Sequence, residues 1–492
     1  MFLGIDCGTQ GTKALVLDSV NGRILGRGAA EHSMISGANG RREQDPAQWV
    51  GALISACKAA LLGAGVDGRQ ILGVGVSGQQ HGLVLLDKYG QVLRPAKLWC
   101  DTETTAENDR LLTELGGPQG SLARLGVAIA PGYTLSKLLW TKEQHPAIFE
   151  QVHSLLLPHD YLNFWLTGRR CSEFGDASGT GYFDVRQRRW NQALLDGIDP
   201  SGRLSRGLPE LVSADQPIGT LLPEVAAQLG INPDAVVASG GGDNMMSAIG
   251  TGNIRPGLFT MSLGSSGTVC GYTDTPVVCD EPAVATFCSS SGGWLPLICT
   301  MNLTNVTSTV RGLFDLDLAS FNQRVAQAPI GAEGVLMLPF LNGERVPALP
   351  QATGTLLGLT ATNLTQANLC RAAVEGTTFG LRYGLDLLRS AGMHSADIRL
   401  VGGGAKSPVW RQLVADIMAT PVVCTREPEA AALGAAIQAA WCADGGGPRR
   451  LEALCAGCVE VDDSTRCEPQ AAQVEAYQRV YEQYREHIPA PM

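Results

Sequence analysis

The feature that most constrains the fold of this chain is an internal repetition of two short glycine-rich patterns. Residues 6–12 read DCGTQGT and residues 262–268 read SLGSSGT, so both contain G-[TS]-x-G-T. A second pair of stretches is also similar: AVVASGGGDNMMSAIG begins at residue 235 and IRLVGGGAKSPVWRQLVADIM begins at residue 398. Each predicts a strand, a triple glycine and then a helix. One glycine motif alone is usually only a turn, but two matched pairs in the same order predict two similar domains. The repeat is too long for a solenoid.

The first of these stretches, GIDCGTQGTK at residues 4–13, has the composition of an anion-binding turn. Its glycines let a ligand approach backbone N–H groups, which bind anionic oxygens, while the carboxylate of Asp6 could face a metal ion. Strand-like segments surround the turn, since MFLGID, KALVLD and GRILGRGAA follow one another with turns between them. The stretch is therefore predicted to be a hairpin turn, whereas a Walker loop or a Rossmann fingerprint would connect a strand to a helix. This combination suggests a nucleotide ligand.

Helical segments complete each predicted α/β domain. QDPAQWVGALISACKAALLGAG has Asp45 as its N-cap and Pro46 at its first helical position, which predicts a helix that ends near Gly63. After it, the loop GQQHG separates two apolar runs and places polar side chains at a strand end. In the second half, Ser407 is the predicted N-cap of a further helix. These elements predict two related α/β domains that face each other across a cleft, with a boundary near residues 245–255.

Length and charge exclude several functions. The chain has 492 residues, enough for two or three domains, and a formal net charge of −10 from 37 basic and 47 acidic residues. No run of Lys or Arg forms a nucleic-acid footprint, and no segment is expected to reach the roughly 18 apolar residues of a membrane helix. The 14 cysteines lie mostly in apolar stretches, which favours reduced core thiols in a cytoplasmic protein. The one close pair, Cys455 and Cys458 in CAGC, lacks the context of a redox or zinc motif.

Eight motifs between residue 1 and about residue 440 resemble, in order, those of the FGGY carbohydrate kinases, and most closely the D-xylulose kinases in that family. The motifs are GIDCGTQGTK, GVSGQQHGLVLLD, LPHDYLNFWLTG, DASGTGYFDV, VVASGGGDN, SLGSSGTV, LPFLNGERVP and LVGGGAKSPVWRQLVADI. The resemblance implies two similar actin-like (ribonuclease H-like) ATPase domains around a central cleft. Residues 1–245 would carry the sugar site and the catalytic base, and residues 246–492 would carry the nucleotide site and a C-terminal helix. The implied reaction transfers the γ-phosphoryl group of ATP to the terminal 5-hydroxyl of D-xylulose, with Mg²⁺ present.

Phosphoryl transfer to a hydroxyl group needs a carboxylate that accepts the hydroxyl proton, and Asp243 is the candidate. The second half has GGGA where the first has GGGD, so Ala405 is expected to occupy the place of Asp243. The scaffold by itself would then not require the acid. Helix capping by Asp243 is a compatible alternative that would stabilise the fold by about 1 kcal/mol. Asp6, at the end of the first strand, is the candidate for Mg²⁺, and Ser262 is its counterpart in the second half.

The resemblance also implies further ligand-binding residues. The candidates for ATP are Thr9, Gln10, Lys13, Gly264, Ser265, Thr268, Gly403, Gly404 and Ala405. The candidates for the sugar are Gln80, His81, Trp99, Asp101, Asp243 and Asn244. Lys13 could instead be a solvated strand residue, and a lone His is more often structural. Around Trp99 the chain departs from the family, because WCDTE stands where many relatives have W-N-D-x-R, and this leaves the identity of the sugar open.

Two alternatives remain open from the sequence. A kinase of the same family that acts on another ketose or polyol, such as ribulose, would differ in the loop at residues 78–82. An actin-like ATPase that phosphorylates no sugar would need an interaction surface or a peptide-binding domain, and only about fifty residues follow residue 440. Among them, AYQRVYEQYREH predicts a terminal amphipathic helix packed on the body. The expected partners are a small sugar and ATP, without nucleic acid or membrane, and a homodimer is left open.

Overall fold

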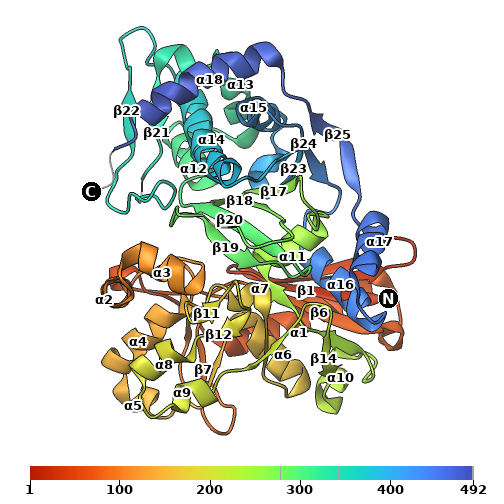
Figure 1. The fold of residues 1–492 in the computed structure, drawn as a ribbon. Helices are drawn as coiled ribbons and strands as arrows, with labels where there is room; N and C mark the ends of the chain where they lie inside the picture. The colour runs from red at the N-terminus through yellow and green to blue at the C-terminus, as the bar shows by residue number, and fades with distance from the viewer. Residues whose placement is uncertain (278, 342, 490–492) are drawn as a thin grey trace. The chain divides into compact units, whose positions relative to one another are not determined.

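A computed structural model describes residues 1–277, 279–341 and 343–489 of the chain (Figure 1). These residues form two compact α/β units, each built on its own sheet. The first unit comprises Met1–Ile254, Thr273–Leu295 and Glu429–Glu460. The second unit comprises Arg255–Tyr272, Pro296–Pro428 and the residues from Val461 onward.

The strands of the first unit are β1 (Phe2–Cys7), β2 (Gly11–Asp18), β3 (Arg23–Glu31), β4 (Ile35–Ser36), β5 (Arg42–Gln44), β6 (Gly73–Gly78), β7 (Val84–Leu86), β8 (Ala96–Lys97), β9 (Ser154–Leu156), β10 (Cys171–Glu173), β11 (Phe183–Asp184), β12 (Arg189–Trp190), β13 (Glu210–Val212), β14 (Pro217–Thr220), β15 (Val236–Ala238), β16 (Gly241–Gly242) and β19 (Ala285–Cys288). Its helices are α1 (Pro46–Ala64), α2 (Thr105–Leu115), α3 (Gly117–Leu125), α4 (Thr134–Gln144), α5 (Pro146–Phe149), α6 (Pro158–Thr167), α7 (Phe174–Ala177), α8 (Gln192–Ile198), α9 (Arg203–Arg206), α10 (Pro223–Leu229), α11 (Asp243–Gly250), α16 (Ala430–Ala443) and α17 (Pro448–Cys458).

The strands of the second unit are β17 (Leu258–Leu263), β18 (Gly267–Gly271), most of β20 (Trp294–Thr300), β21 (Leu336–Leu338), β22 (Thr355–Leu357), β23 (Asp397–Val401), β24 (Val422–Thr425) and β25 (Val461–Cys467). Its helices are α12 (Thr304–Leu313), α13 (Leu318–Gln327), α14 (Gln366–Ser390), α15 (Pro408–Met418) and α18 (Ala471–Glu486). A short 3-10 helix, η4 (Gly403–Lys406), precedes α15.

The main sheets of the two units share the order and directions of most of their strands. The first has the order β14-β15-β6-β1-β2-β3, and the second contains the run β25-β24-β23-β17-β18-β20. In the first, β1 is antiparallel to β2 and parallel to β6. In the second, β17 is antiparallel to β18 and parallel to β23. The predicted opening hairpin and the prediction of two similar α/β domains are confirmed.

The two triple-glycine turns, however, do not occupy equivalent places in these sheets. GGGD contains β16, which pairs with β6 and leads directly into α11. GGGA instead follows β23, and β23 is the counterpart of β6 because each lies parallel to the central strand of its sheet. The counterpart of Asp243 therefore lies between β24 and α16, at residues 426–429. The expectation that Ala405 occupies the place of Asp243 is wrong, because the two similar GGG segments follow strands that hold different positions in their sheets.

The hairpins are equivalent, but their registers differ by one residue. In the first, Asp6 lies opposite Lys13 and the pairing closes at Cys7 and Thr12. In the second, Ser262 lies opposite Thr268, and the last pair joins Leu263 to Gly267. The second turn is thus one residue tighter, although the glycine spacing in the sequence is the same.

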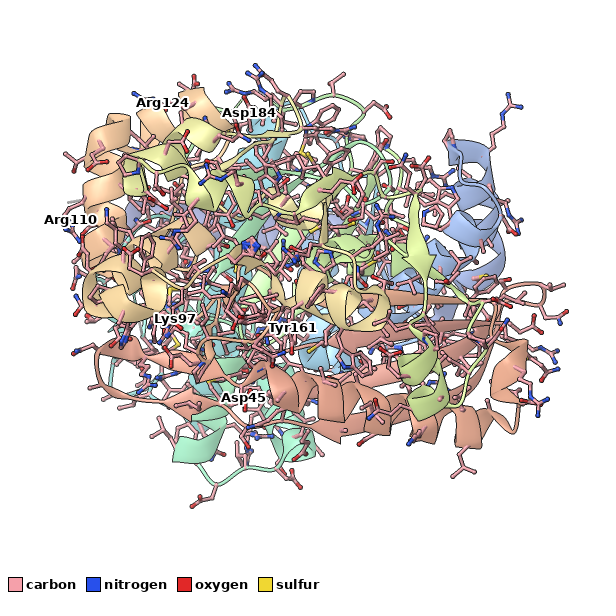
Figure 2. The ribbon with its side chains drawn as sticks, turned by 90° about the horizontal axis from the view of Figure 1, so that it is seen from below. Asp45, Lys97, Arg110, Arg124, Tyr161 and Asp184 are labelled. Atoms are coloured by element: carbon pink, nitrogen blue, oxygen red, sulfur yellow. The ribbon has the colours of Figure 1, made fainter. Side chains whose placement is uncertain are left out.

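Helix α1 confirms its predicted start, because the Ala47 N–H donates to the Asp45 carboxylate at 3.0 Å. Asp45 is labelled in Figure 2. It ends at Ala64, one residue beyond the predicted glycine. By length and composition alone, α1 is apolar enough to cross a membrane, contrary to the expectation that no segment would be. Trp49 and Leu53 are nevertheless fully buried in the hydrophobic core with residues of β1 and β6, as in a core helix.

Helix α16 explains why the compact units are interleaved along the chain. It packs so closely on the first sheet that a Cβ atom at Gly4 of β1 would lie 2.0 Å from the Ala432 carbonyl oxygen. A Cβ atom at Gly75 of β6 would lie 2.0 Å from the Ala435 oxygen. The expected division at residues 245 and 246 treated the halves as consecutive, whereas residues 429–460 pack with the first unit. The assignment of sugar and nucleotide sites to the two halves stays a prediction.

Other local predictions are confirmed. The Ser407 hydroxyl accepts a hydrogen bond from the Trp410 N–H at the start of α15, and Trp410 belongs to the core. The C-terminal helix α18 buries one face, with Tyr477, Tyr481 and Tyr484 inside. All 14 cysteines are free thiols.

Candidate active site

Asp6 and Asp243 are the acids that the sequence singled out, and the structure places them in one electrostatic environment. Asp6 lies at the end of β1, where the Ser77 hydroxyl of β6 donates to its carboxylate at 2.8 Å. Asp243 is the first residue of α11, directly after β16, which pairs with the same strand β6. Burial raises the pKa of Asp6 to about 6. Burial and the negative charge of Asp6 raise the pKa of Asp243 to about 7.

The neighbours of Asp243 are amides. Its Oδ1 accepts hydrogen bonds from the Asn244 backbone N–H at 2.8 Å and from Asn244 Nδ2 at 3.1 Å. Asn244 Nδ2 also donates to Gln80 Oε1 at 2.9 Å, so it links the acid to the loop after β6. Gly242 permits this approach, because a Cβ atom there would lie 2.7 Å from Gln80 Cγ. The N-cap of α11 is Gly242 and not Asp243, so capping of the usual kind does not account for the acid.

Lys13 projects from β2 beside Asp6. Its Nζ lies 2.5 Å from Glu429 Oε2, and Glu429 directly precedes α16. Because Asp6 and Lys13 are paired residues of antiparallel strands, their side chains lie on the same face of the sheet. Lys13 is therefore an ion-paired residue at the site and not simply a solvated strand residue.

His81 has an unusual backbone conformation. Its φ angle is 64°, in the left-handed region that residues other than Gly adopt infrequently and often at functional sites. Its carbonyl oxygen accepts hydrogen bonds from Lys137 Nζ at 2.6 Å and from the Thr134 hydroxyl at 3.2 Å. The ring centroid lies 4.8 Å from that of Tyr133 and 5.7 Å from that of Phe287. The loop thus presents Gln80 and His81 next to an aromatic surface.

Thr9 and Trp99 use their polar atoms within the chain. The Trp99 indole N–H donates to Thr9 Oγ1 at 3.0 Å, and Thr9 Oγ1 donates to Gln79 Oε1 at 3.2 Å. Gln44 Nε2 donates to the Thr9 carbonyl oxygen at 2.7 Å. The glycine turn is therefore held in place by a side chain at the end of β5 and by side chains of the loops that follow β6 and β8. Gln10, at the tip of the turn, is exposed.

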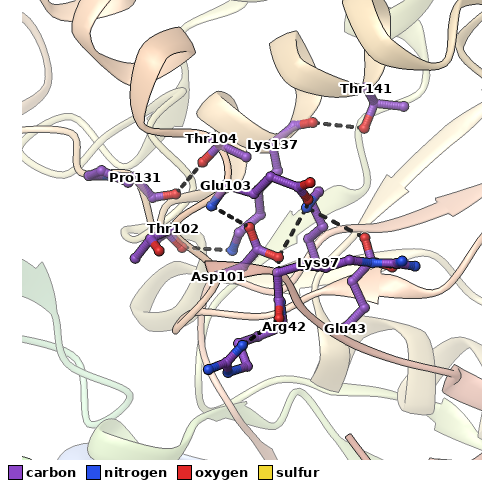
Figure 3. Close-up of polar contacts among 12 residues, drawn as sticks. Arg42, Glu43, Lys97, Asp101, Thr102, Glu103, Thr104, Pro131, Lys137 and Thr141 are labelled. Carbon is purple, nitrogen blue, oxygen red and sulfur yellow. Dashed lines mark hydrogen bonds and ion pairs between the residues drawn. The ribbon is translucent and has the colours of Figure 1, made fainter. Parts of the chain in front are cut away.

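Asp101 belongs to a buried ion cluster (Figure 3). Its Oδ2 lies 3.0 Å from Lys97 Nζ and accepts the Arg42 N–H at 2.7 Å, while its Oδ1 accepts the Glu103 N–H at 3.1 Å. Lys97 Nζ also lies 2.5 Å from Glu103 and 3.5 Å from Glu43. Oxygens of the three acids approach one another within 4.8 Å, but the Lys97 ammonium group supplies the cation that they need. Asp101 is fully buried, so its visible contacts stabilise the loop that carries Trp99.

In the second unit the two glycine motifs lie against each other. A Cβ atom at Gly402 would lie 2.8 Å from the Leu263 backbone, and one at Gly404 would lie 2.9 Å from the Leu263 side chain. The carbonyl oxygen of Gly264 accepts the Thr304 N–H at 3.1 Å, and that of Ser265 accepts the Leu303 N–H at 3.3 Å. This contact brings the hairpin turn, the GGGA turn and the start of α12 together. Thr268 lies on β18 and is partly buried.

A pocket of about 210 Å³ opens beside these turns. Its lining residues are Thr304, Thr307, Ser308, Arg311, Leu318, Phe321, Asn322, Gly403, Gly404, Ser407 and Trp410. Gly403 and Gly404 were expected at the nucleotide, whereas the residues from α12 and α13 carry no motif in the sequence. Ala405 is buried and does not line the pocket. Tyr133 and Phe287 in the first unit were also missed, because aromatic residues far apart in sequence give no local signal.

The family models match both halves of the chain. Residues 1–250 match the N-terminal domain of the FGGY family of carbohydrate kinases, and residues 260–443 match its C-terminal domain. The chain belongs to this family and is an ATP-dependent carbohydrate kinase, so the predicted resemblance is confirmed.

Individual relatives and solved structures add detail to the family match. The chain is 51% identical to the xylulose kinase of Haemophilus influenzae over 492 residues, which cover 99% of both chains. The crystal structure of xylulose kinase from Bifidobacterium adolescentis has a TM-score of 0.82 and 29% identity, covering 97% of this chain and 98% of that one. A gluconate kinase from Lactobacillus acidophilus has a TM-score of 0.90 and 25% identity, covering 99% and 96%. The fold is thus shared by kinases named for different substrates.

Proposed function

We propose that the protein phosphorylates the 5-hydroxyl of D-xylulose with ATP and gives D-xylulose 5-phosphate. The single observation that carries this proposal is the 51% identity, over essentially the whole of both chains, to a relative named xylulose kinase. The arrangement of Asp6, Asp243 and the loop with Gln80 and His81 supports it, because this set supplies an acid pair and polar groups for sugar hydroxyls. We also propose that the enzyme works in the cytoplasm and as a homodimer.

Asp243 is the proposed catalytic base. Transfer of the γ-phosphoryl group removes a proton from the attacking hydroxyl, and a general base is most effective when its pKa lies near the working pH. Burial and the charge of Asp6 raise the pKa of Asp243 to about 7, which meets that condition. Asn244 keeps the carboxylate oriented through its backbone and side-chain N–H groups. The sugar hydroxyl would take the position next to the other carboxylate oxygen.

The residues around Asp6 fit a magnesium ion. Burial raises the pKa of both carboxylates, and the charge of Asp6 adds to the rise at Asp243, so a divalent cation would lower the electrostatic cost of this site. Mg²⁺ commonly binds through one or two carboxylates, water and phosphate oxygens. Asp6 would hold the ion, with Ser77 fixing its carboxylate. When bound, the ion neutralises charge on the phosphate groups of ATP.

ATP would be bound by residues of both sequence halves. We propose that Thr9 and Gln10 offer backbone N–H groups of the first turn and that Lys13 offers its ammonium group. Gly264, Ser265 and Thr268 would act likewise in the second hairpin. The pocket beside Gly403 and Gly404 would take the adenosine, since its wall includes the flat surface of Phe321 and the amide of Asn322. Ala405 would contribute only through its backbone, because its side chain is buried.

The sugar would lie against the loop after β6. Gln80, His81 and Asn244 supply hydrogen-bonding groups, and Tyr133 and Phe287 supply apolar area for the carbon skeleton. Trp99 and Asp101 would act indirectly, by holding Thr9 and the following loop. The gluconate kinase of similar fold shows that the fold alone does not fix the substrate. The alternative substrate is the one that the sequence leaves open, another ketose or polyol such as ribulose.

A phosphorylation screen tests the proposal. Purified enzyme with ATP and Mg²⁺ is tested on D-xylulose, D-ribulose, L-ribulose, gluconate, glycerol and xylitol. The rate of ADP release gives kcat/KM for each compound, and mass spectrometry identifies each phosphorylated product. We expect the highest kcat/KM for D-xylulose and phosphate on its terminal hydroxyl. A higher kcat/KM for another compound would replace D-xylulose as the substrate and leave the kinase assignment intact.

A further inference from the structure

A buried charged cluster lies in the first unit and has no part in the proposed chemistry. His159, the second residue of α6, is fully buried. Its Nδ1 lies 2.5 Å from Asp176 Oδ2, and its Nε2 lies 3.1 Å from Asp160 Oδ1. Burial alone would lower the pKa of His159, but the two carboxylates raise it to about 9. The two acids favour the protonated ring: Nδ1 is bonded to Asp176, whereas Nε2 and Asp160 Oδ1 lie close together without forming a hydrogen bond.

The same residue contacts both glycine segments that carry candidate site residues: Gly78 faces its Cβ and backbone, and Gly240 faces its ring. A Cβ atom at Gly78, which ends β6 and opens the Gln80–His81 loop, would lie 2.9 Å from the His159 Cβ. A Cβ atom at Gly240, which precedes β16 and Asp243, would lie 2.9 Å from the His159 Cδ2. Such close approach means that the loop and the strand rest directly on His159. Neither glycine could be replaced without moving it.

Asn163, one turn later on α6, holds only one of these segments. Its Nδ2 donates to the Ser239 carbonyl oxygen at 2.8 Å, just before Gly240. From the opposite side, Gln438 of α16 accepts the Gly240 N–H at 2.9 Å and donates to the Gly240 carbonyl oxygen at 3.0 Å. The strand before Asp243 is therefore fixed by several polar contacts. His159 differs from Asn163 in that it also contacts the start of the sugar loop.

We propose that His159 is a positioning residue that sets the sugar loop at residues 78–82 and the strand before Asp243 relative to each other. Asp176 fixes the orientation of the ring through Nδ1, and Asp160 places a carboxylate beside Nε2. Asp160 is itself held, because its Oδ2 accepts the Leu157 N–H at 3.0 Å. The proposal rests on the proposed function in one respect, namely that Asp243 and the 78–82 loop act on the same sugar.

The test compares His159→Gln with Asn163→Ala. His159→Gln keeps the Cβ and backbone atoms that meet Gly78 but loses the ring bond to Asp176, so the first turn of α6 is no longer held in place. Because small displacements of reacting groups are costly, we expect His159→Gln to lower kcat and raise the sugar KM, each by roughly tenfold, with the KM for ATP unchanged. Asn163→Ala should lower kcat alone. Hydrogen–deuterium exchange of the free enzyme should rise in both segments for His159→Gln and only in residues 239–243 for Asn163→Ala. His153→Gln, the same change at an exposed histidine, is the matched control.

A double variant separates positioning from stability. Replacing His159 alone leaves Asp176 buried without its cation, whereas His159→Gln with Asp176→Asn removes the charge imbalance while still lacking the ring. We expect the double variant to regain thermal stability but to keep the defects in kcat and sugar KM. Recovery of both kinetic constants with stability would overturn the proposal, as would an unchanged sugar KM or unchanged exchange at residues 78–82 in either variant.

Failure of the proposed function would look different. If Asp243→Asn retained parental kcat, the base assignment would be wrong, yet the exchange pattern of the His159 variants would still test the structural link between the two segments. If Asp243→Asn were inactive and His159→Gln left both segments unchanged, only the positioning role would be lost. The exchange measurement needs no sugar, so it does not depend on the identity of the substrate.

Discussion

The two central sheets have the same strand order, but their turns carry different chemistry. The first has Asp6 as the next-to-last residue of β1 and begins α11 with Asp243, whereas the second has Ser262 as the next-to-last residue of β17. At the place that corresponds to Asp243, before α16, stands Glu429, which forms an ion pair with Lys13. The hairpin scaffold is thus compatible with an acid or a hydroxyl at the same position. Asp243 differs from Glu429 in its neighbours. It lies beside the amide of Asn244 and is affected by the carboxylate of Asp6, whereas Glu429 is paired with the ammonium group of Lys13.

The largest effect that this comparison predicts concerns Asp243. Asp243→Asn keeps the size of the side chain but removes the proton acceptor, so kcat should fall by about 100-fold or more while ATP binding persists. Steady-state kinetics and an ATP titration measure the two properties. The matched variant is Glu429→Gln, at the corresponding place in the other sheet, where we expect at most a few-fold change because a partly exposed ion pair contributes little. A parental rate for Asp243→Asn would remove it as the base.

The next prediction compares the loop after β6 with the loop after β23, which are true counterparts. His81→Ala removes a side chain from the proposed sugar site, so the sugar KM should rise by the equivalent of about 1 to 3 kcal/mol while the KM for ATP stays constant. Gly403→Val should instead raise the KM for ATP and leave the sugar KM constant. A side chain at Gly403 meets no atom within 4 Å and would fill the proposed adenosine pocket. Initial-rate kinetics with each substrate varied separately distinguish the two outcomes. Equal effects on both constants in either variant would contradict the division.

A smaller effect is expected for the paired strand ends. Asp6→Asn should raise the Mg²⁺ concentration for half-maximal rate by about tenfold, since one carboxylate ligand is lost. Ser262→Asn, the same amide at the matching position of β17, should leave the Mg²⁺ dependence unchanged. The measurement is a Mg²⁺ titration at saturating sugar and a fixed ATP concentration. If both variants shifted the Mg²⁺ dependence equally, the effect would not be specific to Asp6, and Asp6 would lose its assignment as the Mg²⁺ ligand.

Much of this scaffold could be predicted from local patterns. The hairpin, the capped start of α1, the Ser407 cap and the buried face of α18 each follow from residues within one or two turns of the chain. The error over Ala405 has a different cause. The two GGG segments look alike in sequence, and each follows a strand. The position of that strand in its sheet depends on pairing with segments far away in the chain, which the local sequence does not reveal.

The candidate site shows the same limit. Asp6, Gln80, His81 and Asp243 stand beside glycines in short motifs, so sequence patterns could single them out. Tyr133, Phe287 and His159 have ordinary neighbours, and their contacts arise only when separate segments pack together. Asp101 had a motif, but burial of Lys97 directs its carboxylate into an ion cluster. Contacts between distant segments are therefore the part that the sequence patterns could not supply.

The smallest effect should appear in stability. Burial and Asp6 raise the pKa of Asp243 from 3.8 to about 7, so the folded protein holds this proton more tightly than the unfolded chain does. The resulting cost to stability is absent below pH 3.8, grows as pH rises to 7 and is constant above it. Asp243→Asn carries no such charge. Its Tm minus the parental Tm, measured by calorimetry in EDTA without ATP, should therefore increase from pH 4 to pH 7 and then level off, with a gain of a few degrees. A flat difference for Asp243→Asn would mean that the acid is not destabilised in the folded state, and the contrast with Glu429 would then rest on kinetics alone.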